Sequence, residues 1–246
     1  MPFDLIYLRT SSSTMNVARE LAEMGLRGRV AIVAGEQKKC RGGLSREWTS
    51  PRGGLWLSVL LRPRLRPERA KLLGIGASLA VAKALETLGV PARVLWPNGV
   101  VVGDKRVGGI LVEAKAVTPS RLEWAIVGIG LYLNFPSRAL PEGLRERAAT
   151  LYEILGAELD LICTLDSILY RFERYCRILE SGEEEKLVSE YSESLYGIGK
   201  KCRLAIGGET IEGVLAGADE SGDLLVETER GLIRVGYERL EELLEF

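Results

Sequence analysis

Short apolar runs separated by turn residues dominate the first half of the chain. Residues 3–8, 30–34, 55–61 and 122–130 are nearly continuous hydrophobic runs. Their length and pattern predict buried strands. Two further runs, 100–102 and 107–112, flank the turn residues Gly103-Asp104. They predict two strands joined by a tight turn, placed centrally in the fold.

Helices are predicted between these strands. The serines and threonine at residues 11–14 are N-cap residues, and the amphipathic run that follows them predicts a helix. Pro67 opens a longer helix to about residue 88, and its many small residues predict close packing on a sheet. A short helix begins at Thr150, and a longer one covers about residues 161–180. The N-terminus of the first helix could also receive a polar ligand, although capping alone would explain its serines.

The pattern changes near Gly197. Short strands with glycine-rich turns follow, at residues 202–206, 210–216, 224–227 and 232–235, which is typical of a small barrel. We therefore expect one domain over residues 1–196 and a second over residues 197–246. The predicted fold class is α/β (α+β), a mixed β-sheet packed by helices and followed by a small β-barrel.

Composition narrows the chemistry. The chain has 246 residues and a net charge of -1, so no bulk charge favours nucleic acid or an anionic membrane. No apolar run reaches the roughly 18 residues of a membrane span, and the first ten residues do not resemble a signal peptide. The four cysteines are scattered, which favours reduced thiols and a cytoplasmic protein. Histidine is absent, which excludes a histidine base or a histidine-ligated metal.

Two segments are candidate ligand sites. Gly108-Gly109 lie inside the second hairpin strand, shortly after Lys105 and Arg106 at the exit of the turn. Glycine in a strand often marks a close approach of a ligand, and the adjacent cation indicates an anionic one. The loop at residues 35–48 is rich in Gly, Lys and Arg and is a candidate phosphate cradle, although it lacks the spacing of a Walker A motif. A plain buried hairpin and a solvated loop are the alternatives.

The ordered motifs resemble the biotin–protein ligase family over almost the whole chain, including its SH3-like C-terminal domain. The resemblance is to the ligase-only form, without a preceding DNA-binding domain. The matching residues are Ser13-Thr14-Met15, Glu36-Gln37, Arg41-Gly42, Arg46 with Trp48, Ser50-Pro51 with Gly53-Gly54, Trp96-Pro97-Asn98, residues 107–113 and Gly128-Ile129-Gly130.

This resemblance implies an ATP-dependent enzyme with Mg²⁺ as cofactor. Biotin's carboxylate attacks the α-phosphate of ATP, and a lysine of a biotin carboxyl carrier protein then attacks the resulting biotinyl-AMP. Catalysis of this kind rests on positioning and on cationic stabilisation of phosphate charge, so no histidine is needed. The implied partners are the carrier, biotin and ATP, without nucleic acid or membrane. A homodimer that uses the strand at 107–112 or its neighbours is a further expectation.

The same resemblance implies roles for individual residues, and no metal-ligating residue among them. Arg41 and Arg106 would be catalytic. Biotin would be bound by Ser13, Thr14, Met15, Gln37, Arg41, Gly42, Gly43, Arg106, Gly108 and Gly109, with Ser13, Thr14 and Gln37 at its ureido head. The nucleotide would be bound by Arg46, Trp48 and Asn98.

Several positions depart from the family pattern. Gly43 stands where the glycine–arginine loop usually has its second Arg, and Arg106 stands where a Lys is usual. Leu95 and Gly99 replace a Lys and an Asp, and Tyr132 replaces an Asn. Two alternatives follow from these changes. One is a weakened or non-catalytic paralogue that binds biotin or its adenylate. The other is a ligase or transferase for another acid, such as lipoate or octanoate, with Cys40 as a candidate nucleophile.

Overall fold

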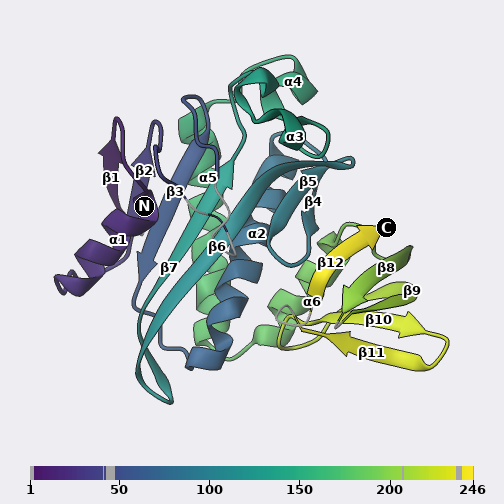
Figure 1. Cartoon of the computed structure of the whole chain (residues 1–246). Coiled ribbons are helices and arrows are strands. Elements are labelled where there is room, and N and C mark those ends of the chain that lie inside the picture. The colour runs from purple at the N-terminus through teal and green to yellow at the C-terminus, as the bar shows by residue number, and fades with distance from the viewer. Residues whose placement is uncertain (1–2, 41, 43–47, 207, 237–239, 246) are drawn as a thin grey trace.

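A computed structural model describes residues 3–40, 42, 48–206, 208–236 and 240–245. Its main part is a seven-stranded sheet with helices on both faces, and its C-terminal part is a separate five-stranded antiparallel sheet (Figure 1). The elements in chain order are β1 (Asp4–Leu8), α1 (Thr14–Glu23), β2 (Val30–Ala34), β3 (Leu55–Leu61), η2 (Pro67–Arg69), α2 (Ala70–Thr87), β4 (Ala92–Leu95), β5 (Gly99–Val102), β6 (Lys105–Thr118), β7 (Arg121–Leu131), η3 (Ser137–Ala139), α3 (Glu142–Arg145), α4 (Leu151–Leu155), α5 (Leu161–Glu180), α6 (Glu184–Ser194), β8 (Lys201–Ile206), β9 (Glu209–Ala218), β10 (Leu224–Thr228), β11 (Gly231–Val235) and β12 (Leu240–Glu245).

The large sheet has the strand order β1-β2-β3-β7-β6-β5-β4. Strands β1 and β2 are parallel, and the remaining neighbours are antiparallel. The sheet is therefore mixed, as predicted. The predicted central hairpin is formed by β5 and β6, but β6 continues as far as Thr118 and is much longer than expected.

The two faces of the large sheet have different partners. Inward residues such as Leu57 and Ile129 join the main core beneath α2 and α5. Small residues let α2 approach closely: a Cβ added to Gly74 would lie 3.0 Å from Val112 Cγ2. On the opposite face, α1 covers only the part of the sheet near Ile32 and Ile126. The rest of that face, beyond α1, carries the candidate site.

The C-terminal sheet has the order β11-β10-β9-β8-β12 and is compatible with the predicted SH3-like fold. Its inner residues, including Leu204 and Leu224, belong to the same hydrophobic cluster as α2 and α6. The indole Nε1 of Trp96 donates a hydrogen bond to the carbonyl of Gly222 at 3.0 Å. The two sheets are thus packed together through shared apolar side chains. The division at residues 196 and 197 falls between α6 and β8 and remains a prediction.

In the part of the chain that the structure describes, no helix combines the length and the apolar character needed to cross a bilayer.

Candidate functional site

A row of glycines crosses the uncovered face of the large sheet. Gly99 pairs with Gly109, and Gly109 pairs with Gly130, so three neighbouring strands lack a side chain at the same level. Trp56 closes the row on β3, where it pairs with Gly130. The row forms a shallow trough in which another group can lie directly against the backbone. Gly108 faces away from it, because its added Cβ would meet the Gly130 carbonyl and Leu131.

The indole of Trp48 lies in this trough. A Cβ on Gly109 would be 2.9 Å from Trp48 Cη2, and one on Gly130 would be 2.7 Å from Trp48 Nε1. The indole stacks on Tyr132 at a centroid distance of 5.2 Å and an interplanar angle of 16°. Its Nε1 is buried and has no hydrogen-bond partner among the described residues. Trp48 therefore forms an apolar wall over the glycine row and carries a donor that a ligand atom could use.

Arg106 reaches over the same trough. A β-bulge at Val107 separates the pairs Val101–Arg106 and Val100–Gly108, and such bulges re-aim side chains. Arg106 Nε donates to the Gly108 carbonyl at 3.0 Å, and its guanidinium lies 5.7 Å from the centre of the Trp48 ring. Its backbone is held by hydrogen bonds with the segment at residues 147–149. The structure therefore holds this cation in place beside Gly109.

Two residues of the Trp96-Pro97-Asn98 motif have different surroundings. Trp96 is buried against the C-terminal sheet, as described above. Asn98 faces the site: its Nδ2 donates to the Ile110 carbonyl at 3.1 Å, and its Oδ1 accepts from Arg106 Nη2 at 3.3 Å. Asn98 thus fixes the turn to β6 and helps to orient Arg106. Lys105, the other cation of the hairpin, lies apart, with Nζ bonded to the Glu146 carbonyl at 2.7 Å.

A second group of site residues gathers at the N-terminus of α1. The Thr14 backbone N–H donates to Gln37 Oε1 at 2.7 Å, and the Thr14 hydroxyl donates to the same oxygen at 3.1 Å. Gln37 Nε2 donates to Ser50 Oγ at 3.1 Å and to Cys40 Sγ at 3.3 Å. Short bridges place residue 37 between residues 11 and 50. Thr14 and Gln37, which the resemblance assigns to the same end of biotin, are therefore in direct contact.

Ser13 and Met15 flank this group. Ser13 is the N-cap residue of α1 and is buried, but its side chain makes no capping bond. Capping therefore does not account for its hydroxyl, contrary to the alternative considered from the sequence. Met15 packs onto β7, where a Cβ on Gly128 would lie 2.8 Å from its Sδ. Both residues are in place to line one end of the site.

A cavity of about 250 Å³ opens beside Gln37, Cys40 and Trp48. Gly42 lies within the loop and is half-buried. The predicted site residues Arg41, Gly43 and Arg46 lie outside the described residues. A role for this loop in binding phosphate therefore stays a prediction.

Ionisable groups at the site are mostly held in one state. Burial raises the pKa of Tyr132 to about 12 and outweighs the opposing effect of Arg106. Tyr132 therefore stays neutral near pH 7. A hydrogen bond from Thr10, with charge from Arg52, lowers the pKa of Glu36. Within the described ranges, no group of three Cys, Asp or Glu side chains could hold a metal ion.

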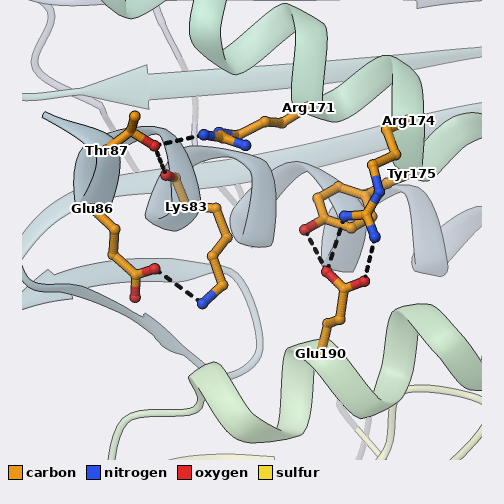
Figure 2. A pocket seen from close by; sticks show the side chains of 7 residues that line it. All are labelled: Lys83, Glu86, Thr87, Arg171, Arg174, Tyr175 and Glu190. Atoms are coloured by element: carbon orange, nitrogen blue, oxygen red, sulfur yellow. Dashed lines mark hydrogen bonds and ion pairs between the residues drawn. The ribbon is translucent and has the colours of Figure 1, made fainter.

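A second cleft, of about 390 Å³, lies on the far side of the sheet between α2, α5 and α6 (Figure 2). Its charges bond to one another: Arg174 and the Tyr175 hydroxyl both donate to Glu190, and Lys83 pairs with Glu86 at 3.0 Å. These bonds tie α5 to α6. The cleft is separated from the trough by the sheet, and we assign it a structural role.

Sequence reasoning missed some residues of the site. Ser58 is fully buried in β3, and its Oγ lies 2.7 Å from Thr14 Oγ1. A single hydroxyl inside the apolar run at 55–61 was the available signal. Tyr132 was noted only as a departure from the family pattern, yet it forms the support for Trp48.

The mixed sheet brings a polar cluster, a glycine trough and a fixed cation to one face, an arrangement suited to a small acid. The chain belongs to the biotin/lipoate A/B protein ligase family, whose model matches residues 7–131. The resemblance to biotin–protein ligases found from the sequence is confirmed by the following relatives.

The bifunctional ligase/repressor BirA of Bacillus spizizenii is 31% identical over 94% of this chain and 71% of its own length. The biotin–[acetyl-CoA-carboxylase] ligase of Paracoccus denitrificans is 29% identical over 89% of this chain and 92% of its own. Among solved structures, a biotin protein ligase from Aquifex aeolicus in complex with biotin and ATP is 32% identical, with a TM-score of 0.81 over 99% of both chains.

Proposed function

We propose that this chain is an ATP-dependent biotin–protein ligase. It activates biotin to biotinyl-AMP with release of pyrophosphate and then transfers biotin to a lysine of a carrier protein. The observation that carries the proposal is the joint placement, on one sheet face, of the Thr14–Gln37 cluster and of Arg106 beside the glycine trough. The relatives named above are biotin ligases, and each matches this chain over nearly its whole length.

The residues divide between a head-group end and a phosphate end. We assign Ser13, Thr14 and Gln37 to the ureido head of biotin, because their hydroxyl and amide groups are buried or half-buried at one end of the site. Met15 adds an apolar thioether wall at the same end. Gly109 and Gly130 let the Trp48 indole lie close to the sheet, which leaves room for biotin beside the indole. Arg106 stabilises the negative charge of the carboxylate and of the α-phosphate as the new P–O bond forms.

Trp48 and Asn98 serve the nucleotide end in this proposal. The indole offers a stacking face, and Asn98 keeps Arg106 in position. ATP is expected to arrive with Mg²⁺ on its phosphate oxygens, because the described part of the chain offers no cluster of carboxylates for a dedicated site. Mg²⁺ would offset phosphate charge, and the residues above bind and orient the substrates.

A thioester mechanism on Cys40 is the alternative. Cys40 accepts a hydrogen bond from Gln37 and therefore lies at the head-group end of the site. This position is unfavourable for a nucleophile that must meet the carboxylate at the other end of the acid. Cys40→Ser should leave a ligase nearly unaffected and would abolish a thioester mechanism.

A homodimer is a further proposal. Beyond residue 110, β6 pairs only with β7 among the described strands, so its other edge has no neighbouring strand there. Such an edge can pair with a second copy of the chain. Sedimentation with and without biotin and ATP tests this proposal, and a monomer under both conditions would contradict it.

The decisive experiment weighs a biotin carboxyl carrier domain after incubation with this protein, ATP and Mg²⁺. Parallel reactions contain biotin, lipoate or octanoate. We expect a biotin-sized mass gain on one lysine and no gain with the other acids. A gain with another acid would change the substrate, and no gain with any acid would favour a protein that binds without catalysis.

A further inference from the structure

The buried hydroxyl of Ser58 poses a specific problem. Ser58 lies in the middle of β3, is 0% exposed and has the apolar Ile32 and Gly128 as its cross-strand neighbours. A buried hydroxyl costs free energy unless it forms a hydrogen bond. Thr14 Oγ1, at 2.7 Å, supplies that bond. Ser58 therefore joins the centre of the sheet to the head-group end of the site.

The direction of this bond follows from proton counting. Gln37 Oε1 accepts from the Thr14 backbone N–H, which can only donate, so the oxygen of the amide is identified. The Thr14 hydroxyl donates its one proton to the same oxygen. Since that proton is used, Ser58 must be the donor to Thr14 Oγ1.

The chain of bonds continues in the same direction. With its oxygen held by Thr14, Gln37 turns its Nε2 towards Ser50 Oγ. The Ser50 hydroxyl then donates to the Trp48 carbonyl at 3.3 Å. We call the series Ser58–Thr14–Gln37–Ser50–Trp48 the hydroxyl relay. Every donor in it has an acceptor, which fixes the amide and the hydroxyls in one orientation.

We propose that Ser58 is a positioning residue: by donating to Thr14 Oγ1, it holds that hydroxyl in the orientation that directs its proton to Gln37. With its proton committed to Gln37, Thr14 Oγ1 can offer a ligand only a lone pair. The site therefore selects an N–H group, as a ureido ring provides, over a dithiolane or an alkyl chain, which have none. This inference rests on the proposed function, because it deepens the assignment of Thr14 and Gln37 to biotin.

The test measures biotin binding by calorimetry in the absence of ATP, followed by steady-state pyrophosphate release. For Ser58→Ala we expect the Kd and the KM for biotin to rise about five- to tenfold, the usual effect of one hydrogen bond. The kcat and the KM for ATP should stay within about twofold. Ser58→Cys keeps a weaker donor and should give an intermediate Kd.

Ser78→Ala is the matched control. Ser78 is also 0% exposed, but it donates to the Ile75 carbonyl within α2, away from the site. The same loss of a buried hydroxyl there should leave biotin affinity unchanged. An equal weakening in both variants would overturn the proposal, since it would indicate general softening of the fold.

Unchanged biotin affinity in Ser58→Ala would also overturn it. If Ser58→Ala does not fold, Ser58→Cys is used for the test instead. A wild-type Kd for biotin in Ser58→Cys would then overturn the proposal. A wild-type protein that binds no biotin would instead overturn the proposed function, and the relay with it. These outcomes are distinguishable, because only the last concerns the unsubstituted chain.

Discussion

Arg106 is the side chain on which the phosphate end of the site depends. We expect Arg106→Ala to lower the rate of biotinyl-AMP formation by roughly ten- to a hundredfold, because a charge-assisted hydrogen bond contributes about 1.5–3 kcal/mol. Pyrophosphate release measures this rate. Lys105→Ala is the matched control, since the neighbouring cation points to Glu146 instead. Equal rates in both variants would remove Arg106 from the mechanism.

Gly109 tests the trough. An added methyl group would lie 2.8 Å from Arg106 Nη2 and 2.9 Å from Trp48. Both contacts are with side-chain ends that can shift, so Gly109→Ala should fold. It should weaken biotin binding at least tenfold by filling the trough. Gly143→Ala is the control, because no atom lies within 4 Å of its added Cβ. Normal biotin affinity in Gly109→Ala would mean that the ligand does not lie on this row.

Sequence patterns revealed those site residues whose type is unusual for the predicted element in which they lie. Paired glycines in a strand next to a cation pointed to Gly109 and Arg106, and both meet at the site. The pairing of residues across strands could not be predicted in this way. That Gly99 and Gly130 lie level with Gly109 depends on the register of three strands, which single-strand patterns do not contain.

At the scale of elements, continuous apolar runs predicted β2 and β3 well, because both are buried on two faces. Residues 114–118 of β6 are exposed, and Glu113 and Lys115 interrupt the apolar run, so the pattern stopped near residue 112 although the strand continues to Thr118. β4 has only four residues beside Pro91 and Trp96-Pro97, and nothing in its composition separated it from a turn. α6 was not predicted, because its sequence is rich in acidic residues. The helix nevertheless packs one apolar side against the core.

The contact between α5 and α6 yields a stability prediction. Burial alone would raise the pKa of Glu190, but hydrogen bonds from Arg174 and Tyr175 outweigh it and hold the pKa below its usual value. We expect Glu190→Gln to lower the free energy of unfolding by about 1 kcal/mol, a modest loss because the pair is partly exposed. Urea denaturation measures this.

The same variant separates the cleft of Figure 2 from catalysis. Biotin transfer by Glu190→Gln should equal that of the wild type when both proteins are folded, because the sheet lies between the cleft and the trough. A loss of transfer without a loss of stability would contradict the structural role that we assign to this cleft.

At the scale of the whole molecule, Asp223 joins the C-terminal sheet to α2. It bonds to Lys71 at 2.7 Å and to Arg234 at 2.9 Å. Burial acts to raise the pKa of Asp223, but these two cations outweigh it and lower the pKa. A lowered folded-state pKa stabilises the protein above the unfolded value of about 3.9 and loses that effect as the pH falls through the folded value.

Asp223→Asn should therefore reduce the free energy of unfolding at pH 7 by about 1–2 kcal/mol. The difference from the wild type should shrink below about pH 4, where the wild-type carboxylate becomes protonated. Denaturation curves at pH 7, 4 and 3 measure it. A difference that stays constant over this range would show that the charge of Asp223 does not tie the C-terminal sheet to α2.

The glycine trough also sets the directions in which this protein can evolve. Its space comes from side chains that are already the smallest available, so every substitution at Gly99, Gly109 or Gly130 can only narrow it. Substitutions at these positions can therefore adapt the site to smaller acids but not to larger ones. Room for a bulkier acid must come from the opposite wall, where replacement of Trp48 or its support Tyr132 opens volume in a single step.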